Sequence, residues 1–197
     1  MISLVEPAPD PVLERIVEQA SELLRAQKVG LAVIEPDMNL DAPWASNDFG
    51  PVLRFVAARG LSDQVALRIR PRHWRDGTTP MSIHERRPVW SEDVLHDPAI
   101  DLTPETRRAI EAEGYHAVLS VPLLVRDGAL GALVLYRVEP GPFTPETVEL
   151  AQVFATQAAH AIENARLYRR AEDRASKLHT LSALTRMIVS LTTSGEA

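Results

Sequence analysis

The sequence predicts an α+β fold, in which helices from both ends of the chain cover one face of an antiparallel sheet. Three observations support this prediction. Apolar residues recur at helical spacing near both ends of the chain, and short apolar or alternating runs fill the middle. A two-residue turn, Asp127-Gly128, joins two of these runs, and turns of this kind connect antiparallel neighbours.

The first predicted element is an amphipathic helix over residues 12–24, whose apolar side chains form one stripe. Asp10 suits the N-cap position, and Pro11 suits the first helical position. The acidic, proline-rich residues 1–9 are therefore assigned to an N-terminal tail.

Three strands are expected in the first half of the chain. Val29–Ile34 is a short apolar run typical of a buried strand. Val52–Arg59 resumes this character after a long loop over Pro36–Pro51. Val65–Arg70 alternates apolar residues with small or basic ones, which is the pattern of a half-buried strand.

The middle of the chain is predicted to hold two short helices and one more strand. The first helix opens after the irregular stretch from Pro71, at Thr79-Pro80, and runs to Arg86; the strand covers Pro88–Val94. The segment Thr103-Pro104-Glu105 is a helix start, because its residues suit the cap, the first position and the positive end of the helix dipole. This second helix should end at Gly114.

A hairpin and a long helix complete the predicted order. Ala117–Val125 and Ala129–Val138 are expected to form the hairpin, since the Asp-Gly turn between them favours the positive φ that such turns need. A helical pattern follows from Thr144 and continues almost without a pause.

The last part of this helix carries an apolar repeat of about 3.5 residues, which Arg174 interrupts. A seam of this kind usually packs against a partner helix, so we expect a coiled coil or bundle. The alternative is a single amphipathic helix that folds back on its own domain. The residues of the predicted dimer and signalling seam are Leu167, Ala171, Leu178, Leu181 and Ile188.

The composition argues against several classes of function. The 197 residues carry a net charge of −6 and no cysteine. An acidic chain is not suited to bulk nucleic-acid binding. The lack of cysteine excludes disulfides, thiolate catalysis and cysteine zinc sites. No apolar run approaches the roughly 18 residues that span a bilayer, and the N-terminus is no signal peptide, so we expect a cytoplasmic location.

Four segments, in this order along the chain, resemble the GAF domain family. They are Arg87–Val94, Gly114–Leu123 with its Ser-Val-Pro-Leu core, Asp127–Leu135, and Phe143–Tyr168. The resemblance implies a six-stranded antiparallel sheet with a ligand pocket on one face. It also implies that the terminal helices cover the other face, where they pair with a second copy to form a homodimer.

The resemblance further implies a place within a larger signalling protein. GAF domains usually precede another GAF domain, a histidine kinase of a two-component system or a nucleotide cyclase. We therefore expect an N-terminal tail over 1–9, a GAF-like sensory domain over 10–170, and a coiled-coil or linker helix over 171–197 that leads to a downstream output domain.

Nothing in the sequence predicts a catalytic centre. One branch of the family reduces free methionine sulfoxide with cysteines, and this chain has none. It also lacks the G-x-S-x-G elbow, a phosphate loop and a dinucleotide fingerprint. Glu92 and Asp93 are neighbours on a predicted strand, so their side chains should point to opposite faces. Any catalysis is expected in an output domain outside this chain.

The cofactor is expected to be an unidentified small molecule or none. Covalent bilin usually needs a cysteine and is disfavoured, and the N-K-F-D-E motif of cyclic-nucleotide-binding members is absent. Haem needs an axial ligand, normally histidine. His116 is the best candidate, but haem-binding members place their ligand upstream of this point, so haem is not expected. The histidines show no metal-ligand spacing on one helix face.

The candidate ligand-binding residues lie on the predicted pocket face, in the long loop or in the lid over residues 71–100. Trp74 and Trp90 can stack on a planar ligand, and Arg75 can pair with an anionic group. The full set is Trp44, Phe55, Trp74, Arg75, Ser82, Trp90, His116 and Ser120.

Three functions remain open at this point. The first is a non-catalytic sensory domain that binds a small ligand and signals through its C-terminal helix. The second is a structural dimerisation module whose pocket is filled by its own side chains, with Phe55, Trp74 and Trp90 large enough to do so. The third is a haem-based gas or redox sensor.

Overall fold

The structure, a computed structural model, describes residues 10–34, 52–62, 74–126 and 128–193, with the side chains of the last helix described through Tyr168 and at three later positions. Within these residues an antiparallel sheet has the strand order β2-β1-β5-β4-β3. The strands are β1 (Lys28–Ile34), β2 (Leu53–Arg59), β3 (Val89–Ser91), β4 (Ala117–Val125) and β5 (Gly128–Arg137). The predicted α+β class with an antiparallel sheet is confirmed.

Two predictions lie outside the described residues. They are the strand over Val65–Arg70 and the loop over Pro36–Pro51 that contains Trp44. The described part of the sheet has five strands, so the sixth strand stays a prediction.

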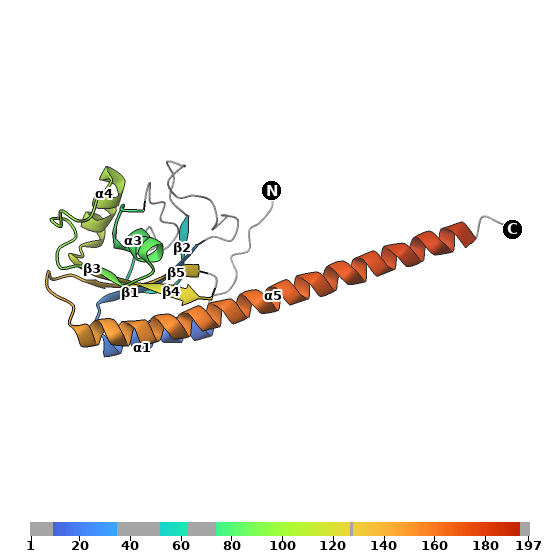
Figure 1. The fold of residues 1–197 in the computed structure, drawn as a ribbon, viewed down its shortest axis with the longest axis horizontal. Helices are drawn as coiled ribbons and strands as arrows, with labels where there is room; N and C mark the ends of the chain where they lie inside the picture. Colours follow the sequence, from blue (N-terminus) through green and yellow to red (C-terminus); the bar gives the residue numbers. More distant parts are fainter. Residues whose placement is uncertain (1–9, 35–51, 63–73, 127, 194–197) are drawn as a thin grey trace. The chain divides into compact units, whose positions relative to one another are not determined.

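The helices in the described residues are α1 (Pro11–Leu23), α3 (Thr78–Glu85), α4 (Pro104–Glu113) and α5 (Pro145–Thr193). Figure 1 shows α1 and the first turns of α5 on one face of the sheet, here called the back face, and α3 on the opposite, front face. The chain divides into one compact unit that ends at His160 and a second that begins at Ala161.

The back face is sealed by α1 and by residues 145–160 of α5. Asp10 caps α1, as predicted: its Oδ1 accepts a hydrogen bond from the Val12 amide at 2.9 Å. Thr144 precedes α5, and its Oγ1 accepts a hydrogen bond from the Thr147 amide at 3.2 Å. The side chains buried on these helices are Leu13, Ile16, Val17, Ala20, Ala151, Phe154, Ala155, Ala158 and Ala159.

Strand β3 is shorter than the predicted strand over Pro88–Val94, since it ends at Ser91. The chain turns directly afterwards: the His96 amide donates to the Asp93 carbonyl at 3.0 Å, and the Val94 amide donates to the His116 carbonyl at 2.8 Å. Glu92 and Asp93 therefore lie beyond the strand, and the expectation that they alternate across a sheet was wrong. Residues 92–103, between β3 and α4, are called the lid segment below.

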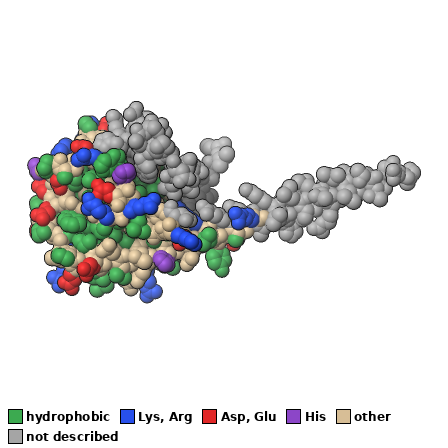
Figure 2. Space-filling model, viewed as in Figure 1, with side chains coloured by type: hydrophobic (Ala, Val, Ile, Leu, Met, Phe, Trp, Pro, Cys, Tyr) green, Lys and Arg blue, Asp and Glu red, His purple; other side chains and the backbone are tan. Residues whose placement is uncertain are grey.

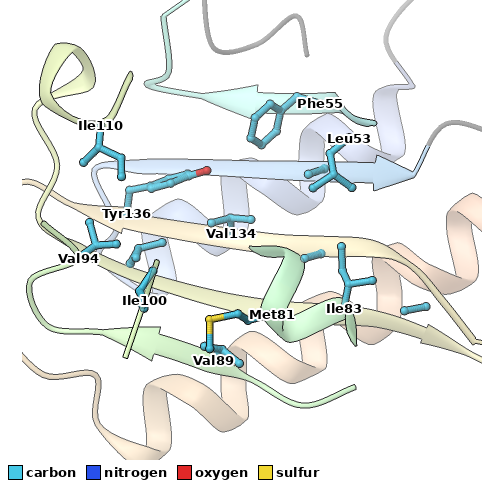
Figure 3. Close-up of a cluster of buried hydrophobic side chains, with 14 of the residues drawn as sticks. Leu53, Phe55, Met81, Ile83, Val89, Val94, Ile100, Ile110, Val134 and Tyr136 are labelled. Carbon is cyan, nitrogen blue, oxygen red and sulfur yellow. The ribbon is translucent and has the colours of Figure 1, made fainter. Parts of the chain in front are cut away.

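The front face carries a second core, which Figure 3 shows beneath α3. Helix α3, the lid segment and α4 all contribute apolar side chains that pack on the sheet. The cluster includes Ala32, Phe55, Met81, Ile83, Val89, Val94, Ile100, Ile110, Val118, Val134 and Tyr136. Both faces of the sheet are thus covered, one by the terminal helices and the other by elements from the middle of the chain.

The surface carries charges of both signs, as the composition implies. On the face shown in Figure 2, acidic and basic side chains are interspersed with apolar ones. No helix in the described ranges is long and apolar enough to cross a membrane.

Candidate functional site

A group of buried hydroxyls lies between α3 and the front face of the sheet. Ser120 on β4 is fully buried, and its Oγ lies 2.8 Å from Thr78 Oγ1 and 3.1 Å from Thr79 Oγ1. Ser82, also fully buried, donates to the Thr79 carbonyl at 2.9 Å. Two predicted site residues, Ser82 and Ser120, are therefore close together, and α3 supplies the threonines that join them.

Ser91 adds a buried hydroxyl to this face that, unlike those of Ser82 and Ser120, has no hydrogen-bond partner among the described residues. Its partner across the strands is Val118, while Val89 is opposite Ser120, so Ser91 and Ser120 are diagonal neighbours on the front face. Ser91 is only 2% exposed, and the described residues offer its Oγ no hydrogen-bond partner. A buried hydroxyl without a partner costs about 1–3 kcal/mol, so this atom is suited to bind a polar group that comes from elsewhere.

The apolar wall of the site includes Phe55, a predicted site residue that is buried on β2. A Cβ at Gly30 would lie 2.4 Å from the Phe55 ring, so the glycine makes room for it. Tyr115 and Tyr136 complete the wall on the α4 side, with ring centroids 4.5 Å apart. Burial raises the pKa of both phenols, and they stay protonated at neutral pH.

Trp74 and Arg75 lie at the entrance to α3. The Trp74 ring stacks on His84 with centroids 4.8 Å apart, and the Arg75 guanidinium lies 5.6 Å from the Trp74 ring. Arg75 also pairs with Asp101 at 3.3 Å and donates to the Ala99 carbonyl at 3.2 Å. These contacts join α3 to the lid segment, so an anionic ligand would have to compete with Asp101 for the guanidinium.

Asp76 makes a second connection between α3 and α4. Its carboxylate is buried and accepts a hydrogen bond from the Thr103 amide at 3.0 Å and another from the Thr103 hydroxyl at 3.3 Å. Thr103 in turn caps α4, because its Oγ1 accepts from the Thr106 amide. The segment that leads into α3 and the start of α4 are therefore linked through Asp76.

Trp90 is not part of the front-face group. In β3 the side chains of Val89 and Ser91 are buried, and Trp90 points to the other side with 45% of its surface exposed. It lines an open depression of about 420 Å³ together with Ser91, Glu92, Asp93, His96 and Asp97. The structure thus separates Trp90 from Phe55, Ser82 and Ser120.

His116 contacts the lid segment through Asp93. Its Nδ1 lies 3.2 Å from one carboxylate oxygen of Asp93, and His96 Nδ1 lies 2.8 Å from the other. The hydrogen bond from His96, assisted by that from His116, holds the pKa of Asp93 below its usual range. In the described part of the chain no three acidic or histidine side chains form a group that could hold a metal ion.

Glu113, at the end of α4, is a buried charged group that sequence reasoning missed. Its Oε2 lies 2.7 Å from Lys28 Nζ, and its carboxylate also accepts hydrogen bonds from the amide and hydroxyl of Ser62. Burial alone would raise the pKa of Glu113, but the hydrogen bonds from Lys28 and Ser62 outweigh it and hold the pKa below the usual range. This group fastens α4 to the first strand.

Of the other residues that sequence reasoning missed, Ser91 had a usable signal. Alternation along Val89-Trp90-Ser91 places the serine on the same face as a buried valine. Thr78 and Thr79 had none, because their partner Ser120 is 42 and 41 residues away along the chain, and the contact of Asp93 with His116 spans 23 residues.

Comparisons with known proteins identify the family and the fold of the chain. The GAF domain model matches residues 8–162. No curated protein matches. A domain of a two-component sensor histidine kinase protein from Sinorhizobium meliloti 1021 is 23% identical with a TM-score of 0.62, covering 83% of this chain and 98% of that one.

Two further solved structures share the fold. The blue-light absorbing form of the PixJ GAF domain from Thermosynechococcus elongatus is 16% identical with a TM-score of 0.62, covering 81% of this chain and 88% of that one. A segment of a methyl-accepting chemotaxis protein is 22% identical with a TM-score of 0.61, covering 80% of this chain and 90% of that one.

Proposed function

The chain belongs to the GAF domain family, and from this premise we propose that it is a non-catalytic sensory domain that binds a small molecule on its front face. The response passes through a dimeric C-terminal helix to a downstream output domain, such as a histidine kinase, a nucleotide cyclase or a second GAF domain. The sensor kinase and chemotaxis proteins with the same fold support a role in signalling.

The observation that carries the ligand proposal is the buried Ser91 hydroxyl. It lies on the front face, diagonal to Ser120, and lacks a partner among the described residues. Ser120, Thr78 and Thr79 can each donate or accept, so their mutual hydrogen bonds can rearrange around a polar ligand atom. With apolar walls from Phe55 and the neighbouring cluster, the site is suited to a small, largely apolar molecule with one or two polar atoms.

Ligand binding predicts a specific effect of Ser91→Ala. Native mass spectrometry of the wild-type chain, purified by mild steps, should show a bound mass that is largely lost in Ser91→Ala. The free energy of unfolding of the ligand-free variant should be unchanged or slightly higher than that of the wild type, because an unsatisfied hydroxyl has been removed. Thr156→Val serves as the control, since this exposed hydroxyl on α5 donates to the Gln152 carbonyl of its own helix at 2.8 Å and should not affect the bound mass.

A structural dimerisation module is the second candidate, and the filled front-face cluster favours it. Met81 and Ile83 from α3 pack against the sheet side chains, and the Ser120 hydroxyl is satisfied within the protein. In that case the wild type carries no bound mass, and the stability of Ser91→Ala is again unchanged or slightly raised. The haem sensor remains a weaker alternative, which fails if the chain shows no Soret band after haem addition.

The signalling proposal rests on α5, which continues as a helix to Thr193. Leu167 is 54% exposed in the single chain and Ala171 is exposed, as expected of residues that a partner helix would cover. The side chains of Leu178, Leu181 and Ile188 lie outside the described residues.

Dimerisation through this helix predicts the effect of two changes. Light scattering at tens of micromolar should give a dimer mass for the wild type and a monomer mass for Leu178→Lys/Leu181→Lys, because two apolar positions of the proposed interface become charged. A monomeric wild type, or a dimer that both lysines leave intact, would count against the paired-helix proposal.

A further inference from the structure

The side chains of His96, Asp93 and His116 converge at the edge of the sheet, and we propose that they form a proton-sensitive latch that holds the lid segment on β4. Each imidazole Nδ1 contacts a different oxygen of the same carboxylate, at 2.8 Å for His96 and 3.2 Å for His116. The input of this latch is the proton concentration, so the inference goes beyond the proposed function and does not depend on whether a small molecule binds the front face.

The latch joins two parts of the chain. Asp93 and His96 belong to the lid segment, whereas His116 directly precedes β4 and donates its amide to the Arg137 carbonyl of β5 at 2.9 Å. The side-chain contact runs beside a backbone contact, the 2.8 Å hydrogen bond from the Val94 amide to the His116 carbonyl. Protection of the Val94 amide therefore reports directly on whether the lid segment is attached.

The two histidines have different roles in this arrangement. His96 and Asp93 are three residues apart on the same segment, and the His96 side chain is 76% exposed. His116 bridges 23 residues of sequence and is 38% exposed. Of the two histidines, His116 is the one that connects the lid segment to the sheet, so its charge adds to the contacts that hold the lid, and His96 acts by sharing the same carboxylate.

Histidine is the side chain whose charge changes between about pH 5 and 8. A neutral imidazole can give Asp93 an ordinary hydrogen bond, while an imidazolium adds an ion pair to it. The contact between the lid segment and the sheet is therefore stronger at pH 5.5 than at pH 8. Since Asp93 and both histidines are partly exposed, the change should be about two- to fivefold, as for other ion pairs near solvent.

Other charged groups near the latch do not replace the histidines. Glu92 and Asp97 line the same depression and add negative charge there. On α4, Arg107 donates to the Leu95 carbonyl, and on β5 Arg137 donates to the Pro142 carbonyl with its guanidinium 4.4 Å from the Phe143 ring. Among the charged groups that the structure describes, His96 and His116 are the ones that shift the pKa of Asp93.

The latch controls the cover of the front face. The lid segment contributes Val94 and Ile100 to the front-face cluster, and both are buried. Opening of the lid segment would expose these two side chains to solvent and would uncover the front face near Ser91. A fall in pH therefore shifts the population toward the closed lid, and a rise shifts it toward the open lid.

Hydrogen exchange of the intact 197-residue chain tests this proposal. Amide protection factors are measured from pH 5.5 to 8.0 and corrected for intrinsic exchange. Protection of the Val94 amide in the wild type should be about threefold higher at pH 5.5 than at pH 8.0. His116→Gln should abolish this rise, because it keeps the backbone carbonyl but removes the titrating charge. His160→Gln, at an exposed position on α5, should retain it.

Two results would overturn the latch. One is a protection factor of the Val94 amide that does not change between pH 5.5 and 8.0 in the wild type. This measurement needs no variant. The other is a rise of the same size in His116→Gln. Should that variant fold poorly, Asp93→Asn provides the same test, because a neutral amide cannot form an ion pair with either imidazolium.

Discussion

The Gly131→Val variant is expected to lose at least about 3 kcal/mol of unfolding free energy, the largest effect of any single change considered. Gly131 lies on β5 opposite Val33 of β1, in the centre of the sheet. A Cβ at this position would lie 2.0 Å from the Ala32 carbonyl oxygen and 2.7 Å from the Val33 Cα. Both atoms belong to backbone, so β1 and β5 would have to separate.

Gly141→Val is the matched control for this prediction. Gly141 has a φ of +154°, close to the +158° of Gly131, but a Cβ there would meet nothing within 4 Å. The two variants therefore share the backbone strain and differ in the steric clash. Urea unfolding should show a loss for Gly131→Val that is larger by about 2 kcal/mol or more. Equal losses would mean that β1 and β5 do not approach each other as described.

The Glu113→Gln variant is expected to lose about 3 kcal/mol of unfolding free energy at pH 7. The side chain of Glu113 is 3% exposed and that of Lys28 is 17% exposed, so solvent screens this ion pair little. The amide would leave the Lys28 ammonium without its counter-charge, and it would also weaken the hydrogen bonds to Ser62. Lys28→Met/Glu113→Leu should lose less than Glu113→Gln, because both charges are removed together.

The same carboxylate gives the stability a predicted pH dependence. The pKa of Glu113 is lowered in the folded protein, so its contribution is complete above the ordinary range near about pH 4.3 and is lost as the pH falls through the lower, folded value. The difference between wild type and Glu113→Gln should therefore be constant from pH 7 to 5.5 and shrink below about pH 4. A difference that persists undiminished in acid would show that the charge of Glu113 is not what stabilises α4.

Local sequence signals predicted much of the fold. The caps at Asp10 and Thr103 place the starts of α1 and α4, and Gly114 ends α4 in the left-handed conformation with a φ of +66°. The hairpin of β4 and β5 followed from an Asp-Gly turn between two apolar runs. These features are decided by neighbouring residues, which is why a single sequence shows them.

The candidate site was predicted less well, because its contacts are long-range. The pairing of Lys28 with Glu113 spans 85 residues, and that of Thr78 with Ser120 spans 42. Trp90 was placed among the pocket residues, although its side chain turns away from the front face, because alternation along a strand fixes relative faces but not which face is enclosed. The end of β3 at Ser91 was missed since the Val94 amide bonds to His116, a partner that no local pattern reveals.

In the proposed function the front face, covered by α3 and the lid segment, holds a small molecule beside Ser91 and Ser120. A crystal structure of the 197-residue chain, grown from protein purified without denaturation or extensive dialysis, tests it most directly. We expect electron density for a bound molecule with a polar atom within hydrogen-bond distance of Ser91 Oγ. A front face filled only by the side chains of α3 and the lid segment, with Thr78 still bonded to Ser120, would contradict it.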